Sequence, residues 1–102
     1  MGYEVGDIDA TLAAAAGEDA ALFVELRQAF SESLAAQVDL LKRSRCDGNW
    51  RMSALRIKGL AASFRAEPLI DLAEDALLAA PGDPVAVRRI QSWLNDFSVT
   101  SA

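Results

Sequence analysis

The sequence predicts an all-α protein, specifically an up-and-down antiparallel four-helix bundle with a short additional N-terminal helix. Apolar residues recur at helical spacing along most of the chain, and no stretch shows sustained strand alternation between hairpin turns. The predicted turns are short, so consecutive helices are expected to pack antiparallel. A length of 102 residues fits one domain with one modest core. We therefore expect residues 1–102 to form a single domain.

The N-terminal part of the chain predicts two helices of unequal length. The short first helix is expected to start after Asp7, a good N-cap, and to end at Gly17, a residue typical of the position after a helix. The long second helix is expected over 18–44, a length of about 40 Å. Its apolar stripe consists of Leu22, Phe23, Leu26, Phe30, Leu34, Val38 and Leu41.

Turn residues separate the three helices that follow. The break over 46–49 predicts a third helix that begins near Trp50, capped by Asp47 or Asn49. Pro68 is expected in the first turn of a fourth helix. Asp83 is the predicted N-cap and Pro84 the first residue of a fifth helix that frays after Ser98. The buried residues expected in the fifth helix are Val87, Ile90, Leu94 and Phe97.

The charges are unevenly distributed along the chain. The formal net charge is −5, but the segment 42–65 is basic and holds Asp47 as its single acid. Its basic residues are Lys42, Arg43, Arg45, Arg51, Arg56, Lys58 and Arg65. Such a segment is typical either of a solvated helix face or of a surface that binds an acidic partner. The isoelectric point near 4.5, and the lack of a basic helix interleaved with aromatic residues, argue against a nucleic-acid interface.

The residue inventory argues against most catalytic and metal-binding classes. The chain has no histidine and a single cysteine, Cys46, which excludes Ser/His/Asp and Cys/His catalytic sets, zinc fingers and an internal disulfide. Ser53 and Ser63 have no base to activate them. The acids Glu67, Asp71, Glu74 and Asp75 are expected on a solvated helix face. We therefore expect no enzyme activity, no cofactor and no metal.

The N-terminal residues and the apolar runs bear on location. The first residues lack the basic and apolar regions of a secretory signal, and no apolar run approaches the length of a membrane span, about 20 residues. A lone cysteine fits a reducing compartment. We therefore expect a cytoplasmic protein without a membrane partner.

The predicted third helix carries an unusual outer face. Its core stripe is formed by Trp50, Ala54, Ile57, Ala61 and Phe64. Leu55 then falls nearly opposite the stripe, with Met52 and Gly59 on one side of it and Arg51, Lys58 and Ala62 on the other. An apolar and small-residue centre with a basic rim, to which Arg56 also belongs, is the composition of a docking patch. The alternatives are a lid helix that covers the patch, or a homodimer.

The segment Leu55–Phe64 resembles the H-x-L-K-G-x-A-x-x-[LF] helix of histidine phosphotransfer (HPt) domains, the carriers of phosphorelays. The similarity continues through Ala66, Glu67, Leu69, Leu72, Ala73 and Leu77, and residues 20–97 can be aligned with the family pattern. It implies a four-helix bundle in which the active histidine is exposed midway along one helix. It also implies that Lys58 lies beside the phosphorylation position and that Gly59 allows the partner's active-site loop to approach.

The chain departs from the family pattern at the residue that carries the chemistry. Leu55 stands at the position of the phosphoaccepting histidine, Arg65 replaces a glycine, and the connection that precedes Leu55 is about one turn shorter than usual. The resemblance therefore implies a non-phosphorylatable pseudo-HPt domain in two-component signalling that binds a response-regulator receiver domain. The residues expected to bind this partner are Arg51, Met52, Leu55, Arg56, Lys58, Gly59, Ala62 and Arg65.

Two other interpretations of the Leu55 patch follow from the sequence. The chain can be a structural helical module that homodimerises through the patch and has no connection to phosphorelays. Alternatively, Leu55 is an engineered or aberrant replacement in a true phosphotransfer protein. Both interpretations assign the same surface to the patch and differ in what binds there.

Overall fold

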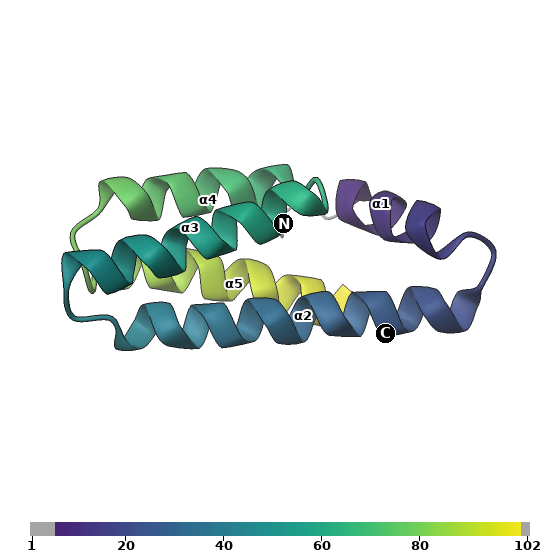
Figure 1. Cartoon of the computed structure of the whole chain (residues 1–102), viewed down its shortest axis with the longest axis horizontal. Helices are drawn as coiled ribbons and strands as arrows, with labels where there is room; N and C mark the ends of the chain where they lie inside the picture. Colours follow the sequence, from purple (N-terminus) through teal and green to yellow (C-terminus); the bar gives the residue numbers. More distant parts are fainter. Residues whose placement is uncertain (1–5, 101–102) are drawn as a thin grey trace.

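The computed structural model describes residues 6–100, and within this range the chain is entirely helical (Figure 1). Five helices follow each other, with no strand among the described residues. They are α1 (Gly6–Ala16), α2 (Ala20–Arg43), α3 (Asp47–Ser63), α4 (Glu67–Leu78) and α5 (Pro84–Thr100). The all-α class that the apolar spacing predicts is thus confirmed.

The long helix α2 organises the packing. It contacts both α3 and α5, and α4 also contacts both α3 and α5, so each of these four helices has two neighbours. Figure 1 shows α2, α3, α4 and α5 side by side, and α1 beyond the N-terminal end of α4, against the first half of α2. This position keeps α1 away from the middle of α3. No helix among the described residues is both long and apolar enough to cross a membrane.

Several helix ends agree with the sequence predictions. Gly17 follows α1 with a φ of 67°, the left-handed conformation that glycine adopts without strain. Helix α2 lies within the predicted range 18–44 but begins two residues later, at Ala20, because Asp19 is its N-cap, whose Oδ1 accepts a hydrogen bond of 3.0 Å from the backbone N–H of Leu22. Asp83 accepts a bond of 3.2 Å from the N–H of Val85 at the start of α5, which begins at Pro84.

Other predicted helix ends are wrong. Helix α1 begins at Gly6, so Asp7 lies inside the helix and not before it. Helix α3 begins at Asp47 with Cys46 as N-cap and no side-chain cap bond, so neither Asp47 nor Asn49 caps it. Asp47 instead lies in the first turn, where a carboxylate interacts favourably with the helix dipole. Helix α5 continues to Thr100 and does not end at Ser98.

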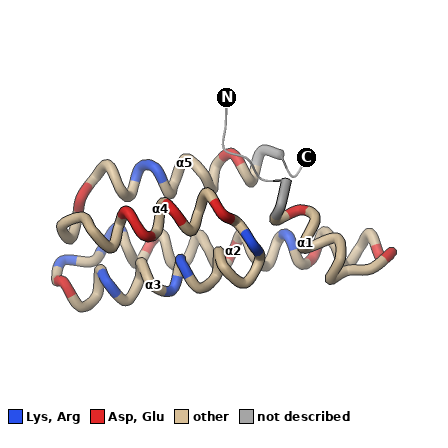
Figure 2. Tube along the Cα trace, turned by 90° about the horizontal axis from the view of Figure 1, so that it is seen from above, with Lys and Arg blue, Asp and Glu red and all other residues tan. Residues whose placement is uncertain are grey.

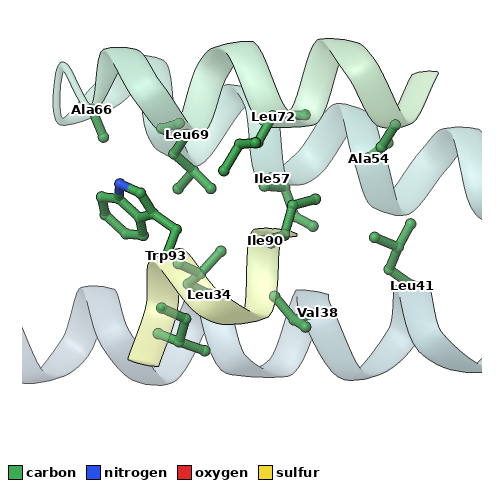
Figure 3. Packing of buried hydrophobic residues seen from close by; sticks show 14 of the residues in the cluster. Leu34, Val38, Leu41, Ala54, Ile57, Ala66, Leu69, Leu72, Ile90 and Trp93 are labelled. Atoms are coloured by element: carbon green, nitrogen blue, oxygen red, sulfur yellow. The ribbon is translucent and has the colours of Figure 1, made fainter. Parts of the chain in front are cut away.

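The core is formed by the inward faces of all five helices. Figure 3 shows part of it, with labelled side chains from α2, α3, α4 and α5. Trp50, Ala54, Ile57 and Ala61 are buried as the stripe of α3 predicts, and the Trp50 Nε1–H donates a hydrogen bond of 2.8 Å to the carbonyl of Ala76. Phe64, the last residue of that stripe, is half-buried. The buried side of α3 therefore follows from its periodicity.

Three large side chains differ from the prediction. Trp93 is fully buried, although the predicted stripe of α5 omits it, and Val87 of that stripe is half-buried. Leu22, predicted on the apolar stripe of α2, is 37% exposed. Leu22 lies in the part of α2 that only α1 accompanies, whereas the apolar stripe is fully covered only where α3 and α5 are also present.

A buried arginine connects the N-terminal helix to the rest of the fold. Arg27 of α2 is 6% exposed, and its Nε lies 2.9 Å from Oδ1 of Asp9 in α1. Its guanidinium carbon also lies 3.8 Å from the centroid of the Phe97 ring in α5, a cation–π arrangement. Together with the buried side chains of Ile8 and Leu12, this contact holds α1 on α2.

The turn between α3 and α4 places an arginine in a strained backbone conformation. Arg65 has a φ of 58°. Its N–H bonds the carbonyl of Ala62 at 3.2 Å, and the N–H of Ala66 bonds the carbonyl of Ala61 at 2.8 Å. This pair of bonds defines a Schellman motif, whose left-handed position favours glycine. The cost of a side chain at such a position is of the order of 1 kcal/mol.

Arg65→Gly is therefore expected to stabilise the protein. Glycine relieves the left-handed strain, and we expect the free energy of unfolding to rise by about 0.5–1 kcal/mol. Thermal unfolding followed by circular dichroism measures this as a gain of a few degrees in Tm, about 4–8 °C per kcal/mol in a domain of this size. Arg65→Ala is the control, since alanine keeps the strain. Equal Tm values for the two variants would contradict backbone strain at residue 65.

Candidate functional site

The outer face of α3 exposes two large apolar side chains next to each other on the helix. Met52 is 53% exposed and Leu55 is 42% exposed, which agrees with the orientation that the core stripe of α3 predicts. Arg51, Arg56, Gly59 and Ala62 are also exposed, and Lys58 is partly exposed. No part of the described chain covers this face as a lid, because α1 packs elsewhere, on α2.

Gly59 lies on the same face without an internal reason for being glycine. A Cβ atom built on Gly59 would meet no other atom within 4 Å. Glycine inside a helix costs about 1 kcal/mol relative to alanine. The space above Gly59 is therefore open to a second molecule, and no packing contact of the described chain benefits from the missing side chain.

On the side of α3 that faces α4, the positive charge of Lys58 is compensated by an acid of α4. Nζ of Lys58 lies 3.1 Å from Oε2 of Glu74 in α4. The exposed face of α4 carries the acids Glu67, Asp71, Glu74 and Asp75. Figure 2 shows these acidic positions along α4 beside the basic positions of α3. A cation that could meet an acidic partner is thus already paired within the chain.

The side of α3 that faces α2 is hollowed. A groove of about 330 Å³ runs between the two helices. It is lined by Leu40, Arg43 and Ser44 of α2 and by Asn49, Met52, Ser53 and Arg56 of α3. Leu40 is 39% exposed, so a third large apolar side chain lies across the groove from Met52. The carbonyl of Leu40 accepts a bond of 2.7 Å from Ser44 Oγ, which fixes this end of α2.

The arginines around the groove differ in their partners. Arg43 forms an ion pair of 2.9 Å with Asp39 one turn earlier in α2. Arg51 and Arg56 have no ion pair among the described residues. Arg56 lines the groove, whereas Arg51 does not. The free positive charge next to the groove therefore comes from Arg56.

Arg65 lies apart from the other predicted partner-binding residues. It follows the end of α3 and lines a separate groove of about 300 Å³ with Ala10, Thr11 and Ala14 of α1. The structure thus brings together Arg51, Met52, Leu55, Arg56, Lys58, Gly59 and Ala62 on α3 and places Arg65 beside α1. Two residues of α2 adjoin the group: Leu40, which was not predicted, and Arg43, which was predicted only as part of the basic segment 42–65.

The chemistry of this face is that of binding. The side chain of Leu55 has no lone pair with which to attack a substrate. The hydroxyl of Ser63 is engaged in a hydrogen bond of 3.0 Å that it donates to the carbonyl of Gly59. Ser53 is buried. Within residues 6–100, no group of three or more His, Cys, Asp or Glu side chains is arranged to hold a metal ion. Apolar contact and charge are what the face can offer a second molecule.

Comparisons with known proteins do not assign the chain to a family. No family model matches it, and neither a curated protein nor a solved structure matches it significantly. The function therefore has to be argued from the residues and their arrangement.

Proposed function

We propose that this protein is a pseudo-HPt domain that binds a response-regulator receiver domain without exchanging phosphate. The observation that carries the proposal is the exposed face of α3, where Met52, Leu55 and Gly59 are uncovered. This face coincides with the helix that resembles the phosphotransfer motif. An exposed apolar centre with a charged rim is the anatomy of a protein interface.

We also propose that α2, α3, α4 and α5 form an up-and-down antiparallel four-helix bundle, with α1 as an addition. The pairwise contacts of these four helices support the arrangement. Helices that follow each other along the chain are in contact, namely α2 with α3, α3 with α4 and α4 with α5, and the contact of α5 with α2 closes the bundle. In such a bundle the middle of α3 faces outward on one side, which leaves Leu55 accessible to a folded partner.

The proposed partner offers complementary chemistry. The active-site face of a receiver domain, where HPt domains dock, carries several carboxylates, and the basic residues of α3 would attract them. Because leucine cannot accept a phosphoryl group, binding there would shield the receiver's phosphorylation site without draining its phosphate. The role is regulatory and fits a cytoplasmic protein.

Leu55→Asp is expected to weaken receiver binding at least tenfold. The variant places a carboxylate at the centre of the patch, opposite an acidic partner, where apolar contact is lost and like charges repel. Binding of purified receiver domains from the same organism to the immobilised protein, measured by biolayer interferometry, tests this. Val85→Asp is the matched control. Val85 is 41% exposed, nearly the same as Leu55, but it lies on α5 and not on the face of α3 that is proposed to bind.

Stability separates a binding role from a core role for Leu55. Substitutions at exposed positions usually change the free energy of unfolding by less than about 0.5 kcal/mol. We therefore expect Leu55→Asp to keep the wild-type helicity and Tm. Failure of the wild-type chain to bind any receiver domain would reject the proposed function, and unfolding of the variant would reject the patch itself.

A homodimer is the second candidate, and the charge arrangement favours it specifically. Basic residues on α3 and acidic residues on α4 lie side by side on one surface (Figure 2), so two copies could bring unlike charges together around Leu55. Sedimentation equilibrium of the wild-type chain at micromolar concentration tests this candidate. A dimer that Leu55→Asp dissociates would favour the structural module over the receiver-binding domain.

A further inference from the structure

We propose that this protein has a second interaction surface, on the first half of α2, which binds an amphipathic helix of another protein whose polar side is basic. The surface lies on the side of α2 that faces α5 and is separate from the exposed face of α3. The inference goes beyond receiver binding and does not rest on it, because none of the residues involved is among those predicted to bind a receiver domain.

Helix α2 extends past the helix that packs on this side of it. Ser98, close to the end of α5, lies beside Ser31 of α2, and their hydroxyl oxygens are 3.4 Å apart. From Ser31 back to Ala20, α2 has α1 as its neighbour, and α5 lies beside its second half (Figure 1). Over about 17 Å, the length of a three-turn helix, no described helix therefore continues the line of α5 along α2.

The uncovered part of α2 is hollowed on this side. A groove of about 360 Å³ is lined by Phe23, Val24, Arg27, Gln28 and Ser31 of α2 and by Ser98 of α5. A second groove of about 290 Å³ shares Phe23 and reaches the turn between α1 and α2, where it is lined mainly by small residues such as Ala13, Gly17 and Ala20. Val24 is 63% exposed and Phe23 is half-buried, so apolar contact is available where the two grooves meet.

The charges around the two grooves favour a basic partner. Four exposed acids line the grooves or follow a lining residue on α2, and none forms an ion pair within the described range: Glu18, Asp19, Glu25 and Glu32. Arg27, the only base before Lys42 in the sequence, is 6% exposed and paired with Asp9. A partner with lysines or arginines around an apolar stripe would meet carboxylates at the rim and apolar side chains at the centre.

A helix is the partner shape that this surface fits. The two grooves together follow α2 from Ala20 to Ser31, so a helix laid along them would pack on the first half of α2 as α5 packs on the second half. Apolar residues three and four positions apart on that helix would contact Phe23 and Val24, the usual mode of helix-in-groove recognition. A second copy of the chain fits less well, because a symmetric contact would set acids against acids.

The test uses a fluorescently labelled peptide of leucine and lysine, about four helical turns long, whose leucines follow helical spacing. One control peptide carries glutamate in place of lysine. The other keeps the composition but alternates leucine and lysine, which spreads the leucines around a helix. Fluorescence anisotropy at roughly 150 mM salt measures binding to the full chain. We expect the first peptide to bind at least tenfold more tightly than either control.

Matched variants of the chain locate the contact. Val24→Gln is compared with Val85→Gln, and Glu25→Lys with Asp71→Lys, because Val85 and Asp71 are exposed on α5 and α4, outside both grooves. Glu25→Lys and Asp71→Lys change the net charge equally, so a difference between them reports position. We expect Val24→Gln and Glu25→Lys each to weaken binding of the first peptide by fivefold or more, and the two controls by less than twofold.

Three outcomes would overturn this inference. Equal affinity for the helical and the alternating peptide would mean that charge alone binds them. Equal effects of Val24→Gln and Val85→Gln would place the peptide outside the grooves. Self-association of the wild-type chain in sedimentation velocity that Val24→Gln abolishes would assign the grooves to a second copy. Each of these results leaves receiver binding untouched, since Leu55→Asp tests that function on α3.

Discussion

Phe30→Ala is expected to cause the largest loss of stability among single substitutions in this protein. Phe30 is 2% exposed, and its ring lies edge-on to three other aromatic rings. The distance between ring centroids is 5.2 Å to Phe64, 5.2 Å to Phe97 and 6.1 Å to Trp93. It therefore joins α2 to α5 and to the end of α3. Removing a buried phenylalanine costs about 3–5 kcal/mol, from lost burial and the cavity that remains.

Urea denaturation followed by circular dichroism measures this loss. Because small domains are stable by only about 5–15 kcal/mol, the midpoint should move to a much lower urea concentration. Phe23→Ala is the control, since Phe23 is on the same helix but only half-buried, and a clearly smaller loss is expected. A loss below about 1 kcal/mol for Phe30→Ala at unchanged m-value would mean that the aromatic cluster does not hold α2, α3 and α5 together.

Helical periodicity identifies which side of a helix is buried, but it does not show how far its neighbours extend. Trp50, Ala54, Ile57 and Ala61 were predictable because α3 packs against other helices along its whole length. Leu22 belongs to the same pattern in α2 and is nevertheless exposed, because α2 extends past the helices that cover its other half. Trp93 fits the spacing around Ile90 and Phe97, but a narrow stripe drawn through Leu94 omits it.

The candidate site shows the same division between local and tertiary information. The exposure of Met52 and Leu55 follows from one helix alone, since the face opposite the core stripe must point outward. Leu40 could not be assigned from sequence, because its relevance depends on which side of α2 lies next to α3. The Lys58–Glu74 ion pair and the position of Arg65 beside α1 likewise depend on how separate helices pack.

If the proposed function holds, Leu55→His is expected to create a phosphoryl acceptor at a position where the wild-type leucine offers no nucleophile. An exposed imidazole with an ordinary pKa of about 6.5 is largely neutral at pH 7 and nucleophilic. Its nitrogen would attack the phosphorus of the receiver's aspartyl phosphate, the bond from phosphorus to the carboxylate oxygen would break, and the carboxylate would leave. We expect slow transfer from a phosphorylated partner receiver, detected as acid-labile labelled phosphate on the variant, and none on the wild type.

The surroundings of residue 55 determine how fast that transfer can be. Lys58, which in the resembling family accompanies the histidine, is bound to Glu74 at 3.1 Å and is thus drawn toward α4. Misplacement of the reacting groups by an ångström can lower the rate about a hundredfold. In addition, a lysine whose charge is already compensated by Glu74 contributes less to stabilising the negative charge of the phosphoryl group. The double variant Leu55→His/Glu74→Gln should therefore transfer faster than Leu55→His.

Acid-labile phosphate on the wild-type chain would contradict the inactive interpretation. A folded Leu55→His variant that binds the receiver but accepts no phosphate would show that the docking geometry has diverged along with the nucleophile.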